Sequence, residues 1–347
     1  MKLFDFFFPI YKNDGRQIAK GLSLLQIDHI NDFSYRLTKG EFSFKKNNCI
    51  CGNENDSEDI VVSEKDQFGI PVVNKICSKC GLIRLDYIFD EESARKFYSN
   101  DYGAIYKSNS LNPENYFKAQ IVKGNRLLEL FNKYVKLENR KDKLVLDIGS
   151  GSGGVLMPFK RDGFNVLGVD FDDEYLSLGK ENKIDLKNGN YDDLIEEQSV
   201  DVIILSHVFE HFSYPLIELV KIVNKIKING YLIFEVPGIF NNRYINPIQQ
   251  VQNAHAYAYF YSDYLRVLFN RVELSVVYSD ESCTFILKKN KNLGEVILKD
   301  VYDSILDGNF NKIKIYLLLK HYRHFFKLNF VQWKNLILFL KIKLRYN

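Results

Sequence analysis

The stretch KLVLDIGSGSGGVLMPFKRDGFNVLGVD, residues 143–170, decides the fold of this chain. It begins with a short apolar run and then passes through four glycines between residues 149 and 154. A helical segment follows, which Gly163 ends, and a second apolar run comes directly after it. A strand, a glycine-rich turn, a helix and a second strand in this order predict one unit of a parallel sheet.

The same alternation continues to about residue 290. Continuous apolar strands separated by helices are typical of a parallel sheet that is covered on both faces. We therefore expect an α/β, doubly wound, Rossmann-like sheet that ends in a hairpin. The further elements that we expect are a helix at 172–183, a strand at 201–208, a helix at 215–228 closed by a turn at Asn229-Gly230, a strand at 231–237, and hairpin strands at 272–280 and 283–289.

Composition bounds the class of protein. The chain has 347 residues, of which 46% are hydrophobic and 26% charged, as in a soluble globular protein of about two domains. We divide it into an N-terminal extension (1–44), a cysteine-bearing domain (45–90), a helical linker or lid (91–140), the α/β domain (141–290) and a tail (291–347). The N-terminus MKLFDFFFPIYKND lacks the features of a signal peptide, and we expect a cytoplasmic protein.

Four of the five cysteines form two close pairs, Cys49 with Cys51 and Cys77 with Cys80. In a reducing compartment such pairs are judged as metal ligands before disulfides. The segment CSKCGL is a common half-site for zinc, and four thiolates satisfy a tetrahedral structural site. The sequence thus predicts a structural Zn²⁺ site; buried reduced thiols or redox chemistry are the alternatives. Cys283 is expected in the core.

The glycine turn fits two cofactor patterns. Gly149, Gly151 and Gly154 satisfy the dinucleotide fingerprint G-x-G-x-x-G, whereas Asp147 with Gly149, Gly151 and Gly153 satisfies D-x-G-x-G-x-G. A dinucleotide places its pyrophosphate at the N-terminus of the following helix, a site that favours anions. The carboxylate of Asp147 brings negative charge to that place, which suits the cationic S-adenosylmethionine better.

The flanking motifs VLDIGSGSGG, VLGVDFD, GNYDDL, DVIILSHVFEHF and NGYLIFEVP resemble the class I S-adenosylmethionine-dependent methyltransferases in the same order. The resemblance implies a seven-stranded sheet and assigns cofactor contacts by position. Gly149 and Gly151 would lie along the methionine portion, Asp147 would orient its amino group, and Asp170 would hold the ribose. Asn190 and Tyr191 would flank the adenine, and His207 would line the methyl-donor pocket. Glu210 and His211 could simply fix the loop after the fourth strand.

The order of a cysteine knuckle, the segment FYSNDYGAIY and this core resembles bacterial enzymes with an N-terminal zinc-binding domain, including sugar C-methyltransferases and relatives encoded among polysaccharide genes. The resemblance implies a sugar acceptor, either nucleotide-linked or part of a surface glycan. It also implies that Tyr102, Tyr106 and His255 face the substrate, with His255 as the general base. Packing of the tyrosines and a structural role for His255 are the alternatives. A small secondary metabolite as acceptor, or a non-catalytic binding protein, are the alternative functions.

The C-terminal tail is basic. Between Gly308 and Asn347 there are nine Lys or Arg and no acid, so that with a net charge of +3 for the whole chain the preceding body carries −6. The tail alternates cations with large apolar residues. It could lie on an anionic membrane surface, form a partner or homo-oligomer interface, or pack on its own domain. Because the body is acidic and no recognition element is evident, we expect no nucleic-acid partner.

Overall fold

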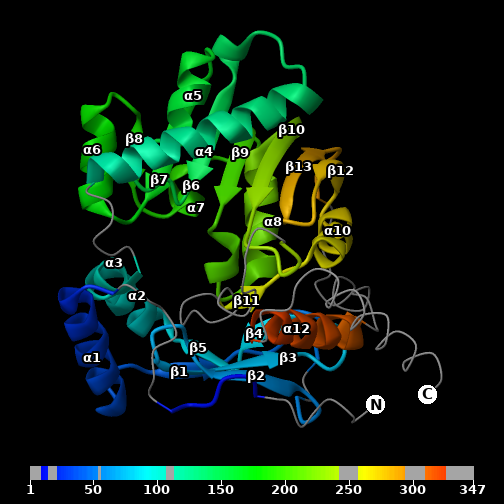
Figure 1. The fold of residues 1–347 in the computed structure, drawn as a ribbon. Coiled ribbons are helices and arrows are strands. Elements are labelled where there is room, and N and C mark those ends of the chain that lie inside the picture. The colour runs from blue at the N-terminus through cyan, green and yellow to red at the C-terminus, as the bar shows by residue number, and fades with distance from the viewer. Residues whose placement is uncertain are drawn as a thin grey trace.

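A computed structural model describes residues 9–14, 22–53, 56–106, 113–241, 257–293 and 309–325. Two units lie one above the other in Figure 1: the α/β domain, and a smaller N-terminal unit that carries the cysteine pairs. His255, the general base expected from the sequence, lies outside the described residues.

A seven-stranded sheet forms the centre of the α/β domain, in the order β12-β13-β10-β9-β6-β7-β8. Neighbours from β10 to β8 run parallel, and β13 runs antiparallel to β10 and β12. The expected doubly wound α/β fold is thereby confirmed. The strands are β6 Leu144–Ile148, β7 Asn165–Asp170, β8 Leu186–Asn188, β9 Val200–Ser206, β10 Ile226–Glu235, β12 Leu274–Ser279 and β13 Thr284–Lys289.

Helices cover both faces of this sheet because its strands are apolar on both sides. Alternate residues of a strand point to opposite faces, so Val202 packs with one group of helices and Ile203 with the other. One face is covered by α4 Pro113–Tyr134, which crosses the front of the sheet in Figure 1, with α5 Leu156–Arg161 and α6 Asp173–Glu181. The other face is covered by α8 Pro215–Lys225 and α10 Ser262–Arg271, and the short α7 spans Tyr191–Leu194.

The N-terminal unit contains a four-stranded antiparallel sheet in the order β11-β4-β3-β2. The edge strand β11 comes from within the α/β domain in sequence, between β10 and α10, so the two units share main-chain hydrogen bonds and an apolar core. The elements are α1 Leu24–Thr38, β1 Phe44–Lys46, β2 Ile60–Lys65, β3 Pro71–Ile76, β4 Ile83–Leu85, β5 Tyr87–Phe89, α2 Glu91–Asn100, α3 Tyr102–Tyr106 and β11 Ala258–Tyr259.

The expected helix at 215–228 is wrong at its C-terminal end. α8 ends at Lys225, and residues 226–228 belong to β10, where Ile226 pairs with Val200. Ile226 is β-branched and fully buried in this pairing, an environment that favours a strand. Asn229 adopts φ +65°, and the pairing register shifts between Ile226 and Tyr231, so the Asn-Gly pair makes an irregularity within β10.

The first helix of the tail packs on its own chain. In α12, Asn309–Phe325, Ile313 and Leu317 are fully buried in the main apolar core, and Phe240 contacts Tyr316 edge to face at 4.7 Å between ring centroids. Of the three expectations for the tail, this helix follows the third. Among the described helices, none combines the length and the apolar character that a bilayer crossing requires.

Candidate active site and cysteine cluster

The glycine turn after β6 adopts backbone conformations that only glycine tolerates easily. Gly149 has φ +69° and Gly151 has φ +53°. A Cβ at Gly149 would stand 2.5 Å from Cγ2 of Val208, in the loop after the neighbouring strand. The turn lies at the carboxyl ends of β6 and β9, next to which the strand order reverses, and this is where open α/β sheets bind their ligands.

Asp147 is a buried carboxylate at the end of β6. Its side chain accepts no hydrogen bond from the described residues, and the residue is only 4% exposed. Burial raises its pKa to about 7, an effect that Lys123 opposes and Asp170 reinforces. A buried carboxylate without a hydrogen-bonding partner is costly unless a cation pairs with it. The position therefore favours a positively charged ligand over a diphosphate.

Lys123 supplies a positive charge to the same place from α4. Burial lowers its pKa, although Glu235 and Asp147 act in the opposite direction. The ammonium of Lys123 also lies 3.9 Å from a carboxylate oxygen of Glu235. With Asp147, it gives the cavity one acidic and one basic group, which complement the ammonium and carboxylate of an amino acid.

Asp170 ends β7 and holds the glycine turn in place. One carboxylate oxygen accepts from the amide of Gly151 at 2.7 Å, and the other accepts from the amides of Phe171 and Asp172. Gln120 of α4 fixes the same turn from the other side. Its Oε1 accepts from Ser152 Oγ and Gly154 N, and its Nε2 donates to the carbonyl of Ser150.

These groups line one cavity of about 1030 Å³. Pockets for one drug-sized ligand typically span about 300–1,000 Å³, so this cavity has room for a cofactor and an acceptor together. Its opposite wall comes from the N-terminal unit, through α1, α2 and α3. Of the site residues expected from the sequence, the following line it: Tyr102, Asp147, Gly149, Gly151, Asp170 and His207.

Four other expected residues do not line this cavity. Gly153 packs against β8, where a Cβ would meet Leu186 at 2.9 Å. Asn190 caps α7, its side chain accepting from the amide of Asp192, and the hydroxyl of the buried Tyr191 donates to Glu218. The hydroxyl of Tyr106 donates to Asp66 Oδ2 at 2.7 Å within the N-terminal unit.

Tyr102 lies at the cavity wall and belongs to a group of stacked tyrosines. Its ring stacks on Tyr106 with centroids 5.7 Å apart, and Tyr98 lies 5.3 Å away on the other side. Burial raises the pKa of Tyr102 to about 12, so its hydroxyl stays protonated and can donate a hydrogen bond. The wall offers flat aromatic surface with hydroxyl groups.

The loop after β9 adds a cluster of charged groups. His207 has φ +58°, an uncommon conformation for a non-glycine residue, and its amide donates to the carbonyl of Glu235. Its Nδ1 lies 3.5 Å from Oε1 of Glu210, and Nε2 of His211 lies 3.8 Å from the same oxygen. Burial raises the pKa of Glu210, but the two histidines outweigh this effect and hold it below its ordinary value.

Sequence reasoning missed the contribution of α4. Tyr116, Gln120 and Lys123 line the cavity and are spaced by four and three residues, so they share one helix face. The spacing of these three polar residues along the helix is the feature of the sequence that could have indicated a cavity wall. It could not be recognised from the glycine turn, because the contacts join residues about 30 positions apart.

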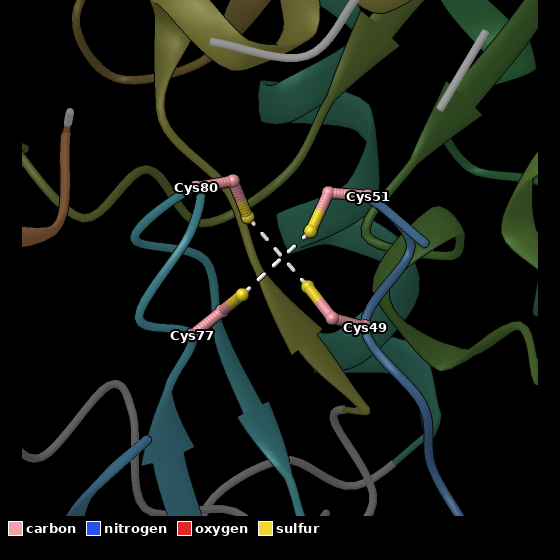
Figure 2. A group of neighbouring side chains, drawn as sticks. All are labelled: Cys49, Cys51, Cys77 and Cys80. Carbon is pink, nitrogen blue, oxygen red and sulfur yellow. Dashed lines mark hydrogen bonds between the residues drawn. The ribbon is translucent and has the colours of Figure 1, made fainter. Parts of the chain in front are cut away.

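The four paired cysteines converge on one point, as Figure 2 shows. Their sulfur atoms all lie within 4.8 Å of one another, and the Cys49–Cys80 and Cys51–Cys77 distances are both 3.6 Å. Zinc bound to four thiolates at about 2.3 Å gives sulfur separations of about 3.8 Å, so this arrangement fits the ion. The amide of Leu82 donates to Cys80 Sγ, and Asn53 Nδ2 donates to Cys77 Sγ.

The chemistry of this cluster is that of a closed, structural site. Each of the four cysteines is at most 3% exposed, and four thiolates leave no coordination position for a substrate. The four thiols interact with one another, which lowers the pKa of Cys77 and raises the pKa of Cys49 and Cys80, so the cluster titrates as one group. Cys283 lies apart in the core, where burial raises the pKa of its thiol.

Comparison with known proteins finds methyltransferases that are similar to the α/β unit. Residues 121–279 match the family model Methyltransf_23, described as a methyltransferase domain. The ubiquinone biosynthesis O-methyltransferase of Rickettsia conorii is 30% identical over 125 residues, which are 34% of this chain and 43% of that protein. The match thus spans less than half the length of that relative. Over residues 121–279 the chain is therefore similar to methyltransferase domains.

Partial matches among solved structures include two methyltransferase-related proteins. A chain from the complex between the Haloferax volcanii Trm112 methyltransferase activator and a putative methyltransferase is 16% identical. It covers 50% of this chain and 98% of its own, with a TM-score of 0.39. An O-methyltransferase family protein from Burkholderia thailandensis is 12% identical, covers 58% of this chain and 63% of its own, and has a TM-score of 0.42.

Proposed function

We propose that this protein transfers the methyl group of S-adenosylmethionine to a sugar, either nucleotide-linked or a precursor of a surface polysaccharide, by O- or C-methylation. The observation that carries the proposal is the cavity itself. One wall presents the glycine turn and the buried carboxylate of Asp147, and the opposite wall presents tyrosines and polar side chains from the N-terminal unit. Aromatic faces bordered by hydroxyl and amide groups are suited to a sugar ring.

Named residues fit the cofactor. Asp147 pairs with its ammonium, Lys123 with its carboxylate, and the turn at Gly149 and Gly151 lets the methionine portion approach the backbone. Asp170 accepts from the ribose hydroxyls at the end of β7. Asn190, Tyr191 and Gly153 are not part of this set of contacts, because they do not line the cavity.

When bound, the cofactor supplies an electrophilic methyl carbon on a sulfonium. Asp147, Lys123 and the turn at Gly149 would hold the cofactor, which would supply a methyl group to an acceptor oxygen or carbon while its sulfur kept the electron pair. The chain aligns the two reactants, which accounts for much of the rate of such a displacement. The acceptor must also lose a proton, so the site needs a base.

The sequence nominates His255 as this base, together with Tyr102 and Tyr106 as substrate-facing residues. Tyr102 lies at the cavity wall, and Tyr106 supports it by stacking from the side. A general base typically contributes about 10²- to 10⁴-fold. His255→Gln should reduce turnover at saturating cofactor by at least tenfold, and a smaller loss would contradict the assignment.

The cysteine cluster has a structural role in this proposal. With Zn²⁺ bound, Cys49, Cys51, Cys77 and Cys80 hold the loops of the N-terminal unit, whose helices α1, α2 and α3 form the acceptor wall. Metal analysis of the purified protein should give about one zinc per chain.

A phenolic acceptor is the second candidate, because the relative from Rickettsia conorii is named for ubiquinone biosynthesis. The deciding experiment incubates the enzyme and S-adenosylmethionine with panels of sugar nucleotides and of small phenols. Intact mass spectrometry then looks for the addition of one methylene. Methylation of phenols alone would replace the sugar proposal, and binding of cofactor without any transfer would favour a non-catalytic protein.

We further propose that the enzyme works in the cytoplasm, and that the basic residues 326–347 contact an anionic membrane surface or a second copy of the chain. Because Ile313 and Leu317 of α12 belong to the core, a truncation must be placed after Phe325 rather than at Gly308. Full-length and truncated protein should differ in co-sedimentation with anionic vesicles. Equal partitioning would exclude the membrane role, and light scattering would then test self-association.

A further inference from the structure

We infer that His207 and Glu210 form a proton-accepting pair for the methyl acceptor, with His207 as the catalytic base and Glu210 as its positioning residue. The inference rests on the proposed methyl transfer and offers His207, within the described part of the chain, as the base in place of His255. His207 lines the cavity directly after β9, next to the glycine turn.

The geometry gives each nitrogen of His207 a separate task. Nδ1 faces Oε1 of Glu210 at 3.5 Å, so a proton on Nδ1 is attracted to that carboxylate. A proton on Nδ1 leaves a lone pair on Nε2, which can accept the proton of an acceptor hydroxyl. The nearest carboxylate to Nε2 is that of Glu235 at 3.9 Å, beyond hydrogen-bond distance.

Glu210 is a buried carboxylate beside the imidazole. The residue is 4% exposed, and its Oε2 has no hydrogen-bond partner among the described residues, which is a costly state for a purely structural side chain. Its backbone carbonyl accepts from the amide of Tyr257 at 2.8 Å, which ties the loop after β9 to the segment before β11.

The backbone conformation of His207 also supports a functional role for this residue. Its φ of +58° is uncommon for a residue with a Cβ, and the amide hydrogen bond to Glu235 holds it there. Strained positions of this kind persist where the surrounding structure enforces them, and they gather at functional sites. The conformation turns the imidazole into the cavity at the strand end.

The charged neighbours set the electrostatics of the pair. Glu210 is faced by His207, His211 and Lys123 and by the hydroxyls of Tyr98 and Tyr102. The second carboxylate near His207, that of Glu235, is engaged by Arg126 at 2.6 Å and by Ser206 Oγ at 2.8 Å. Glu210 is thus the acidic group that remains to stabilise a protonated His207.

The test compares His207→Gln, Glu210→Gln and a control, Glu196→Gln, which makes the same chemical change at an exposed site outside the cavity. Histidine nitrogen NMR first reports which ring nitrogen of His207 carries the proton, with its signals identified among the six histidines by their loss in His207→Gln. Glu210→Gln should reduce the form protonated on Nδ1, since the charge that attracts this proton is removed. The control should leave this tautomer unchanged.

Kinetics with the acceptor that the mass-spectrometric panel identifies complete the test. His207→Gln should lose about 10²-fold or more in kcat while the dissociation constant of adenosylhomocysteine changes less than threefold. Glu210→Gln should move the acidic limb of the pH profile to lower pH, which a merely structural defect would not do. An unmoved limb together with an unchanged His207 tautomer, or a loss of less than tenfold in His207→Gln, would overturn the inference. A wild-type protein that methylates nothing would instead refute the proposed function.

Discussion

Replacement of Asp147 by Asn tests how the cavity selects its cofactor. The free carboxylate has a pKa of about 7, so about 9% of the protein molecules carry it ionised at pH 6 and about 91% at pH 8. Only the ionised form pairs with the ammonium of the cofactor. The contribution of Asp147 to affinity should therefore grow about tenfold between these two pH values.

The size of the effect follows from the lost interaction. A hydrogen bond to a charged group contributes about 1.5–3 kcal/mol, which corresponds to a factor of about 10 to 150 in the dissociation constant. At pH 8, Asp147→Asn should weaken adenosylmethionine binding by that factor, and at pH 6 by about tenfold less. The titration of the ligand's own amino group affects both proteins alike and cancels in their ratio.

Isothermal titration calorimetry of both proteins from pH 6 to pH 8 measures this ratio, with NADH as the control ligand. The reasoning is refuted if the ratio stays constant within twofold over this range, or if the wild type binds NADH and ignores adenosylmethionine. Stability gives a second readout without ligand. Because folding raises the pKa of Asp147, the wild type should lose stability relative to Asp147→Asn as the pH rises from about 4 to about 7.

Three further changes have expected outcomes. Cys77→Ser should lower the zinc content and the melting temperature of the protein, and a strong chelator should have the same effect. The control Cys283→Ser should leave the zinc content unchanged, and equal metal content in all proteins would contradict the four-cysteine site. Gly124→Ala places a Cβ 2.3 Å from the carbonyl oxygen of Val155, so it should lower the free energy of unfolding in denaturant by about 1–3 kcal/mol. The exposed control Lys118→Ala should be neutral, and a neutral result for Gly124→Ala as well would show that α4 and α5 can separate. Tyr106→Phe removes the hydrogen-bond donor to the buried Asp66, so it should lower the free energy of unfolding by about 1–3 kcal/mol without changing the affinity for the cofactor. Weaker cofactor binding would show that Tyr106 reaches the cavity.

The sheet and the cysteine cluster could be predicted because their signals are local. The apolar strands, the glycine turn and the two cysteine pairs each occupy a few consecutive residues, and physical chemistry limits what such patterns form. The end of α8 was wrong because Ile226 also satisfies a helical pattern, and only its pairing with Val200 decides for a strand. Here the pairing between two strands, and not the local helical preference, determines the secondary structure.

The walls of the cavity could not be predicted in the same way. Gln120 reaches the glycine turn from a helix that ends before it, and Tyr106 turns away because Asp66, 40 residues earlier, offers a buried acceptor. In both cases the residue that decides the contact lies in a different part of the sequence, so the local pattern does not reveal it. The resemblance to a family placed Asn190 and Tyr191 by position, but the structure engages both side chains with neighbouring residues of the chain.

The pairing of β11 with β4 has a consequence for biosynthesis. Ile83–Leu85 leave the ribosome long before Ala258–Tyr259 are synthesised. Strand β4 of the N-terminal sheet therefore lacks its partner β11 while about half the protein is made. Metal capture by the cysteines can occur early, but the edge is closed only when the later segment arrives. Expression of the N-terminal unit by itself should hence yield aggregates, and full-length protein should unfold in a single cooperative step.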